Sequence, residues 1–362
     1  FTGKIYVTNH SCSTSEPAYI TLLNAYGGKD SITELSDSAF ANVTTASDKG
    51  MYAKDDDYTA ITGMKSYYYR GAVDNNWVKF GKDSSNKDIY WRIIRINGDG
   101  SIRMIYTGTT VPTESTKVVM TGTGTQITTY RFNSIYNKAE YVGYQYIGGQ
   151  QHGYGECNGS NASCTVTGNT VYNSTIKQQV DKWYEGTTLE KDAATKELVS
   201  QDQIFCNDRS ASSTQTAAWT STGATYYYGA YGRLDKSKSP VLTCPTVSDK
   251  FTVNTSNGNG ALTYPVGLIT ADEVVMAGGV YGKSNSSYYL YTNQYYWVGS
   301  PSTFDSNGYA REFVVFSSGN LRDTDVYNDF VNFNYGARPV VSLSSKAKLS
   351  GSGTYNDVYT VS

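Results

Sequence analysis

The chain has 362 residues, enough for one large domain or roughly two to three smaller ones. Its net charge is −2 and only 17% of its residues are charged, so it lacks the basic field that attracts nucleic acid or anionic lipid. We therefore expect no nucleic-acid partner. The 34 Tyr residues far outnumber the 11 Phe and 5 Trp, and because Tyr tolerates half-exposed positions, we expect much aromatic surface.

The composition favours strands and ordered loops. Gly, Ser, Thr, Asn and Tyr are abundant, whereas helical runs of Ala, Leu, Glu and Lys are scarce. This predicts an α+β protein that is rich in β structure, with few short helices. No apolar run is long enough to cross a bilayer, and no signal peptide is visible at Phe1. We interpret the chain as an excised ectodomain or a processed product.

The first 85 residues predict an N-terminal extension or a small α+β subdomain packed on the main domain, which we place at 86–362. A helix-like stretch from Ala18 to Tyr26 ends at a glycine pair, as helices often do. The three aspartates at 55–57 suggest calcium binding, but a calcium loop needs ligands at alternating positions, and a solvated turn is the stronger interpretation. We predict no metal site and no cofactor.

A β-hairpin is the clearest local prediction. Asp88 to Ile96 and Ser101 to Tyr106 are rich in β-forming residues and flank Asn-Gly-Asp-Gly, whose residues accept positive φ at low cost. Trp91 and Ile93 are expected to pack in the core rather than to contact a ligand.

Two helices follow from capping signals. Ser174 is placed to cap an amphipathic helix that ends near Glu185, and we expect its Trp183 to anchor the core rather than to bind sugar. Residues 264–269 predict a strand that leads into a helix at 270–277. Thr270 and Glu273 match a capping box there, so we assign Asp272 and Glu273 to the helix start rather than to a catalytic pair.

The cysteines favour disulfides. Cys157 and Cys164 flank a short polar segment, which suits a local bridge, while Cys206 and Cys244 would close a longer loop. Cys12 is then left over. No spacing fits a metal site, and disulfides place the protein outside a reducing cytosol, with buried free thiols as the alternative.

The C-terminal third combines many aromatic residues with small polar ones. Residues 309–316 alternate like a strand, and 317–320 predict the turn of a final hairpin. Rigid aromatics among adaptable polar residues are typical of antibody-like binding surfaces. The alternative is a Tyr-rich loop packed against its own domain.

Several runs have a familiar form, namely Glu140–Tyr146, Gln151–Gly153, Ile204–Arg209, Tyr264–Glu273, Tyr296–Pro301 and Gly336–Leu343. Together they resemble surface proteins of gut Firmicutes, many of which look like variable proteins of diversity-generating retroelements. The resemblance covers most of the chain and is most specific in the C-terminal third. It implies a C-type lectin-like fold, related to formylglycine-generating enzymes, with a ligand surface built from a variable region at about 298–335. Many such proteins also carry an N-terminal pilin-like membrane helix, which is not part of this sequence.

The resemblance further implies adenine-directed variation of Asn codons, which never yields Lys, Glu, Gln, Met or Trp. From Val298 to Ser345 there is no Lys, Gln, Met or Trp, and Glu312 is the single Glu. Loop composition alone is the alternative cause of this bias. We expect Glu312 to be template-encoded and invariant.

By position, the residues expected to be variable, exposed and ligand-binding are Ser302, Thr303, Phe304, Tyr309, Arg311, Phe313, Phe316, Arg322, Thr324, Asp325, Tyr327, Asp329, Phe330, Asn332 and Phe333. Residues 288–296 are expected to form a supporting rim. Gly299, Pro301, Gly319, Gly336, Arg338 and Pro339 are expected to be scaffold. For Arg338 we favour a structural ion pair over ligand contact.

These expectations describe a non-catalytic, extracellular, surface-anchored protein that binds a protein ligand on another cell, a phage or a host, with glycan as the weaker option. Related oxidases use late paired cysteines, and no Cys follows Cys244. No Ser nucleophile motif or phosphate loop occurs, and neither do the calcium-dependent sugar-binding triplets. A structural subunit or minor pilin-like component of a surface fibre is the alternative function.

Overall fold

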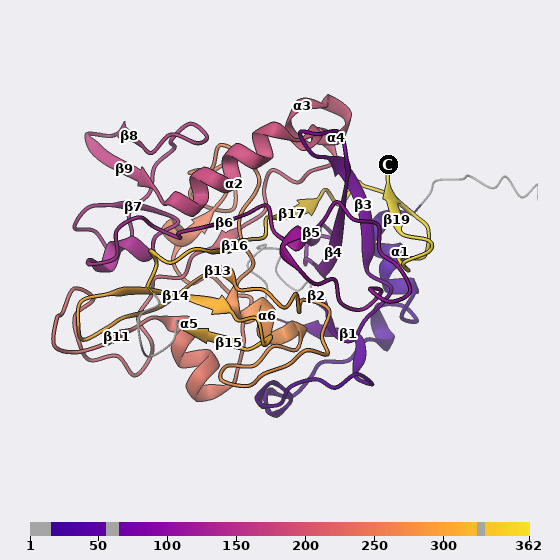
Figure 1. Cartoon of the computed structure of the whole chain (residues 1–362), viewed down its shortest axis with the longest axis horizontal. Helices are drawn as coiled ribbons and strands as arrows, with labels where there is room; N and C mark the ends of the chain where they lie inside the picture. Colours follow the sequence, from indigo (N-terminus) through magenta and orange to yellow (C-terminus); the bar gives the residue numbers. More distant parts are fainter. Residues whose placement is uncertain (1–15, 56–64, 324–329) are drawn as a thin grey trace, which may run out of the picture.

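The computed structural model describes residues 16–55, 65–323 and 330–362, and within these the protein is rich in β structure with few short helices (Figure 1). The helices are α1 (Ala18–Asn24), α2 (Thr175–Gly186), α3 (Thr188–Lys191), α4 (Ala193–Glu197), α5 (Gly229–Tyr231) and α6 (Ala271–Ala277). Short 3-10 turns add η1 (Lys29–Ser31), η2 (Asp37–Ala41), η3 (Thr123–Thr125), η4 (Ala139–Val142) and η6 (Val247–Asp249), and η5 (Gly232–Ser237) is a π-helical turn. The predicted class is therefore confirmed at this level.

An eight-stranded sheet forms one half of the described structure. Its strands are β1 (Lys49–Lys54), β2 (Ser66–Gly71), β3 (Trp77–Lys82), β4 (Asp88–Ile96), β5 (Ile102–Gly108), β17 (Val340–Leu343), β18 (Leu349–Ser350) and β19 (Tyr359–Val361). The order is β1-β2-β4-β3-β19-β18, and β5 joins β4 to β17. Strands from both ends of the described chain thus meet in one sheet.

The predicted hairpin forms the centre of this sheet. β4 and β5 pair antiparallel around the turn, and Gly100 there has φ 81°, a conformation that glycine adopts without strain. Trp91 and Ile93 are fully buried, as expected. The segment before residue 86 shares this sheet, because β3 pairs with β4 across the expected boundary.

A six-stranded sheet forms the other half. It contains β6 (Thr128–Tyr130), β11 (Tyr226–Tyr227), β13 (Tyr296–Phe304), β14 (Ala310–Val315), β15 (Leu321–Asp323) and β16 (Tyr335–Ala337). The order is β15-β14-β13-β16-β6, and β11 also pairs with β13. The predicted final hairpin is confirmed as β14 and β15. α5 and α6 pack against β13 and η4 packs against β14, so the inner strands of this sheet are buried on both faces.

Two small sheets carry the disulfides. β7 (Gln145–Ile147), β8 (Ser163–Val166) and β9 (Asn169–Asn173) form one, and β10 (Phe205–Cys206) pairs with β12 (Lys250–Phe251) in the other. Both predicted disulfides are present, Cys157–Cys164 and Cys206–Cys244. They indicate an oxidising, extracellular environment. Cys12 lies outside the described residues.

The capping predictions hold. The Ser174 side chain accepts a hydrogen bond from the Lys177 N–H at the start of α2, and Trp183 packs edge-on against Trp91 and Tyr106. Thr270 and Glu273 form the expected capping box of α6. The segment before α6 differs, because residues 264–269 make only one isolated bridge instead of a strand. In the described residues, none of the helices is long and apolar enough to span a membrane.

Glu273 also connects α6 to the eight-stranded sheet. Its carboxylate lies 3.1 Å from Arg95 Nε and 2.6 Å from Arg103 Nε, and all three side chains are fully buried. Burial alone would raise the pKa of Glu273, but the two guanidinium groups and the Thr270 N–H hold this pKa below its usual value. The capping interpretation of Glu273 was therefore right but incomplete.

Candidate ligand-binding face

The six-stranded sheet buries part of the predicted binding surface. Ser302, Thr303 and Phe304 on β13 are at most 3% exposed, Phe313 on β14 has no exposed surface, and Phe316 just after it is buried. The expectation that these five side chains are exposed is wrong. The physical reason is that helices and turns from other parts of the chain cover the second face of the sheet.

Other predicted positions remain accessible. The side chains of Tyr309, Arg311, Arg322, Phe330, Asn332 and Phe333 are partly exposed. Their role in ligand binding stays a prediction. Thr324, Asp325, Tyr327 and Asp329 lie outside the described residues.

A continuous line of rings crosses the outer part of this sheet. Tyr309 and Phe330 have centroids 4.3 Å apart, Phe330 and Phe333 6.4 Å, Phe333 and Tyr335 6.4 Å, and Tyr335 and Tyr295 5.2 Å. We call these five residues the aromatic row. Ring pairs at such separations stabilise one another beyond the area they bury, so the row is held in one arrangement.

Buried residues anchor the aromatic row at its Tyr335 end. The Trp297 ring lies 5.0 Å from Tyr335, has no exposed surface, and donates a hydrogen bond from Nε1 to the Tyr130 carbonyl. β16, which contains Tyr335, pairs with β13 on one side and β6 on the other. Tyr335 is therefore held in a sheet, whereas the other four residues of the row lie in the segments next to β13, β14 and β16.

A turn anchors the opposite end. Arg311 donates to Asp305 Oδ2 from Nε at 2.9 Å and from Nη2 at 2.7 Å, and its guanidinium lies 4.7 Å from the Phe330 centroid. Asp305 also accepts the N–H groups of Asn307 and Tyr309 through its other oxygen. These contacts fix Arg311 over the aromatic row rather than leaving it extended in solvent.

Large apolar side chains outside the predicted region enlarge this face. Tyr295 is 38% exposed and Tyr130 is 39% exposed. Tyr130 lies opposite Tyr335 in the β6–β16 pair, and Tyr136 stacks on Phe330 at 5.3 Å. No local signal predicts that the β6 segment lies beside β16, because this position depends on how distant parts of the chain fold together. Of the predicted rim, Tyr288, Tyr289 and Tyr296 are buried whereas Tyr295 is exposed, and its supporting role stays a prediction.

Glu312 lies beneath this face. It is fully buried in β14, opposite Pro301, and neither carboxylate oxygen has a hydrogen-bond partner among the described residues. Burial raises the pKa of Glu312 well above its usual value, against a smaller opposing effect from Arg209. A raised acid pKa means that the neutral carboxylic acid is the favoured form in the fold.

Arg338 belongs to the scaffold. It is fully buried, donates to the carbonyls of Tyr106 and Leu290, and lies 4.8 Å from the Tyr296 ring centroid. The scaffold assignment is right, but carbonyls and a ring hold the guanidinium in place of the expected carboxylate.

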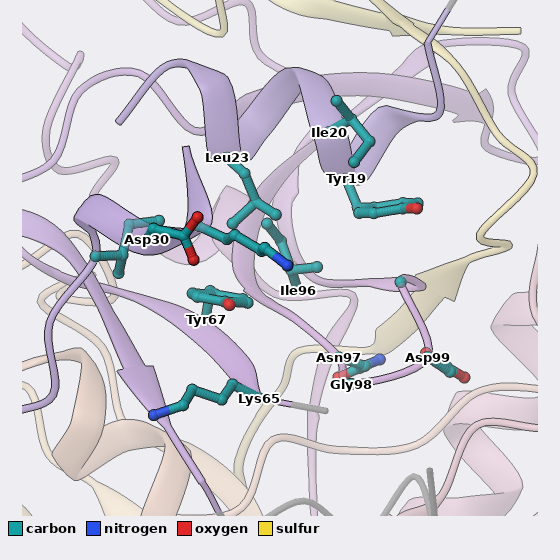
Figure 2. A pocket seen from close by; sticks show the side chains of 13 residues that line it. Tyr19, Ile20, Leu23, Asp30, Lys65, Tyr67, Ile96, Asn97, Gly98 and Asp99 are labelled. Atoms are coloured by element: carbon teal, nitrogen blue, oxygen red, sulfur yellow. The ribbon is translucent and has the colours of Figure 1, made fainter. Parts of the chain in front are cut away.

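A separate pocket of about 620 Å³ lies between α1, β2 and the β4–β5 turn (Figure 2). Figure 2 shows Tyr19 and Leu23 of α1 facing Tyr67 and Ile96, with the β4–β5 turn at one side. This volume is typical of ligand pockets.

Two of the charged residues that line this pocket already have partners in the fold. Asp99 accepts hydrogen bonds from Ser101 and Gln203, and Lys65 pairs with Glu34 and Asp55. Lys29 and Asp30 also line the pocket, so its wall mixes apolar groups with both signs of charge and favours no single class of ligand.

No family model, curated protein or solved structure matches the chain. In the part of the chain that the structure describes, no group of His, Cys, Asp and Glu side chains could hold a metal ion. The aromatic row is therefore the candidate functional site on its own geometry.

Proposed function

We propose that this chain is the displayed part of a surface-anchored protein with a C-type lectin-like fold, and that the aromatic row binds a protein ligand without catalysis. The observation that carries the proposal is a row of accessible, mutually packed rings, which Trp297 anchors at Tyr335. Tyr and Phe rings in fixed positions supply contact area at low entropic cost. The two disulfides agree with display outside the cell.

Ring geometry favours a protein ligand over a glycan. Tyr295 and Tyr335 are stacked at 16° between planes, and Tyr136 and Phe330 at 13°. The facing surfaces of such rings cover one another. Sugars pack on open ring faces, whereas protein side chains also pack against ring edges. A binding experiment on a glycan array is expected to be negative.

The proposal includes a retroelement origin for the diversity of this face. Among the described residues, the accessible predicted positions lie in the aromatic row or near it. Glu312, which adenine-directed variation of Asn codons cannot produce, is buried. This separation of accessible and buried positions suits a protein in which surface residues vary while the buried residues beneath them stay constant. It also sharpens the expected pattern, because variation at Phe313 or Phe304 would disturb the core.

Sequencing the flanking locus tests this origin. We expect a reverse transcriptase gene and a near-copy template that differs from the coding copy at adenines. The differences are expected at Tyr309, Arg311 and Phe333 and not at Phe304 or Phe313. Absence of the template, or differences spread evenly over buried and exposed positions, would contradict the retroelement origin.

Binding itself is tested with a selected probe. A peptide from a phage-displayed random library, selected on the full chain, is expected to bind the aromatic row. The double variant Tyr295→Ser with Phe333→Ser is expected to lose this peptide. Tyr19→Ser, in the pocket of Figure 2, is the matched control and keeps it. Retention of every selected peptide by the double variant would place binding elsewhere.

A structural subunit of a surface fibre is the second candidate, because exposed rings can also pack between identical subunits. Under that function the Tyr295→Ser and Phe333→Ser variant would lose self-association instead of peptide binding.

A further inference from the structure

The β8–β9 hairpin has a well-defined register. Thr167 and Gly168 form its two-residue loop with φ 51° and 78°, as a type I′ turn requires. Val166 therefore forms the hydrogen-bonded pair with Asn169, and Cys164 lies opposite Val171. This turn fixes which backbone groups of β8 point toward β9 and which point away.

Backbone groups of β8 alternate between the two sides. Val166 and Cys164 direct their N–H and C=O groups toward β9, so Ser163 and Thr165 direct theirs outward. Within the described residues β8 pairs with β9 alone and is an edge of the order β7-β9-β8. The outward groups of Ser163 and Thr165 thus form an open pairing edge.

This edge lacks the usual protection against pairing. Residues 157–176 contain no charged residue and no proline. The edge strand β1, in contrast, has Lys49 and Lys54 at its ends and makes a further bridge from Ala53 to Glu34. Charged side chains and prolines on an edge strand prevent pairing with other chains, and β8 carries neither.

Covalent and packing contacts hold the edge in place. The Cys157–Cys164 disulfide ties β8 to the preceding loop, and Val171 beneath it is fully buried. Tyr172 on β9 is 38% exposed and stacks on Tyr146 at 5.3 Å. An ordered edge loses little conformational entropy when another strand pairs with it.

We propose that β8 is a pairing edge for a second copy of this chain. In an antiparallel pair about a two-fold axis at Cys164, Ser163 lies opposite Thr165 of the partner subunit, and each such pair exchanges both backbone hydrogen bonds. Identical strands that carry charge repel one another, and β8 has no charge to prevent this pairing.

The contact is short, so the association is weak and depends on concentration or on display at a surface. β8 contains no residue of the aromatic row, and Figure 1 shows it at the margin of the molecule, beside β9. The inference is therefore independent of the proposed function.

Sedimentation velocity of the full chain, from about 10 μM to about 1 mM, tests the pairing in the range of weak protein contacts. We expect the average mass to rise toward that of a dimer. Hydrogen exchange provides the second measurement, because the amide hydrogens of Ser163 and Thr165 become protected only at high concentration. A chain that stays monomeric throughout overturns the inference.

Thr165→Pro is the decisive variant. It removes the outward N–H, and proline is tolerated on an edge strand where the N–H faces solvent, so the monomer keeps its melting temperature. We expect at least a tenfold weaker association. Thr165→Val keeps the N–H and is the matched control that retains dimerisation. If Thr165→Pro associates like the parent, or if Thr165→Val also loses association, backbone pairing at β8 is excluded.

Discussion

A glutamate with a fully buried side chain contacts each large sheet, and these two glutamates, Glu273 and Glu312, have opposite surroundings. Glu273 bridges α6 to the eight-stranded sheet through Arg95 and Arg103, and its pKa is lowered. Glu312 lies in the six-stranded sheet, has no hydrogen-bond partner in the part of the chain that the structure describes, and has a raised pKa. A buried carboxylate with charged partners helps to specify how the elements pack, whereas a buried carboxylate without a partner lowers the stability of the fold. The difference indicates that the sheet under the aromatic row is not optimised for stability alone.

Removing the charge at Glu273 is expected to have the largest effect. Glu273→Gln leaves Arg95 and Arg103 buried without a counter-charge, and breaking such a group costs about 3–5 kcal/mol. Urea unfolding at pH 7 measures this loss. Glu114→Gln, in an exposed pair with Lys117, is the control and leaves the unfolding midpoint nearly unchanged.

The pH dependence of that variant has a defined sign. Because the folded-state pKa of Glu273 is lowered, its stabilisation is present above the unfolded-state pKa, near 4.3, and is lost as pH falls through the folded value. The stability gap between parent and Glu273→Gln is therefore expected to narrow in acid. A gap that widens below pH 4 would contradict the assignment.

Replacing Glu312 is expected to act in the opposite direction. Glu312→Met removes two unpartnered buried oxygens at similar volume and is expected to stabilise the fold by about 1–3 kcal/mol at pH 8. Since the folded-state pKa is raised, the cost of burying Glu312 grows as pH rises above the unfolded-state value. The gain is therefore largest at alkaline pH and smallest at acid pH, measured by urea unfolding at each pH.

Glu312→Gln refines this comparison. The amide removes the ionisable group but keeps polar atoms, so its gain is expected to be smaller than that of methionine at every pH. The gain is expected to grow with pH in the same way, because that dependence comes from Glu312 in the parent. Destabilisation by both variants would mean that the carboxylate has a stabilising partner after all.

Local interactions explain which parts of the fold the sequence predicted. The Ser174 cap, the capping box of Thr270 and Glu273, and the turn at Gly100 each depend on residues within a few positions of one another. The alternation in β14 likewise predicted a strand. Such signals act before the chain folds and are visible in the sequence itself.

Burial in the six-stranded sheet depends on distant segments and was not predictable in this way. Alternation on β14 suggested one exposed face, but η4 packs against this strand, and α5 and α6 pack against the neighbouring β13. Their coverage buries Phe304 and Phe313. The same long-range folding brings Tyr130 beside Tyr335, which no local pattern near either residue could show.

The smallest stability effect is expected on the aromatic row. Phe333→Ala removes a partly exposed ring and should change the free energy of unfolding by less than about 1 kcal/mol. Phe313→Ala, only twenty positions earlier in the same sheet region, removes a fully buried ring and should cost about 3–5 kcal/mol. Chemical unfolding of both variants under one condition provides the comparison.

Binding should show the reverse order once stability is taken into account. At a temperature where both variants are folded, Phe333→Ala is expected to weaken the binding of a peptide selected on the parent chain by more than about tenfold, because the Phe333 ring contributes to the exposed row. Phe313→Ala should bind that peptide within about twofold of the parent, because the buried ring supports the sheet without contacting a ligand. If Phe333→Ala instead unfolds the protein while binding stays intact, the row belongs to the core, and the surface that recognises ligands lies elsewhere on the molecule.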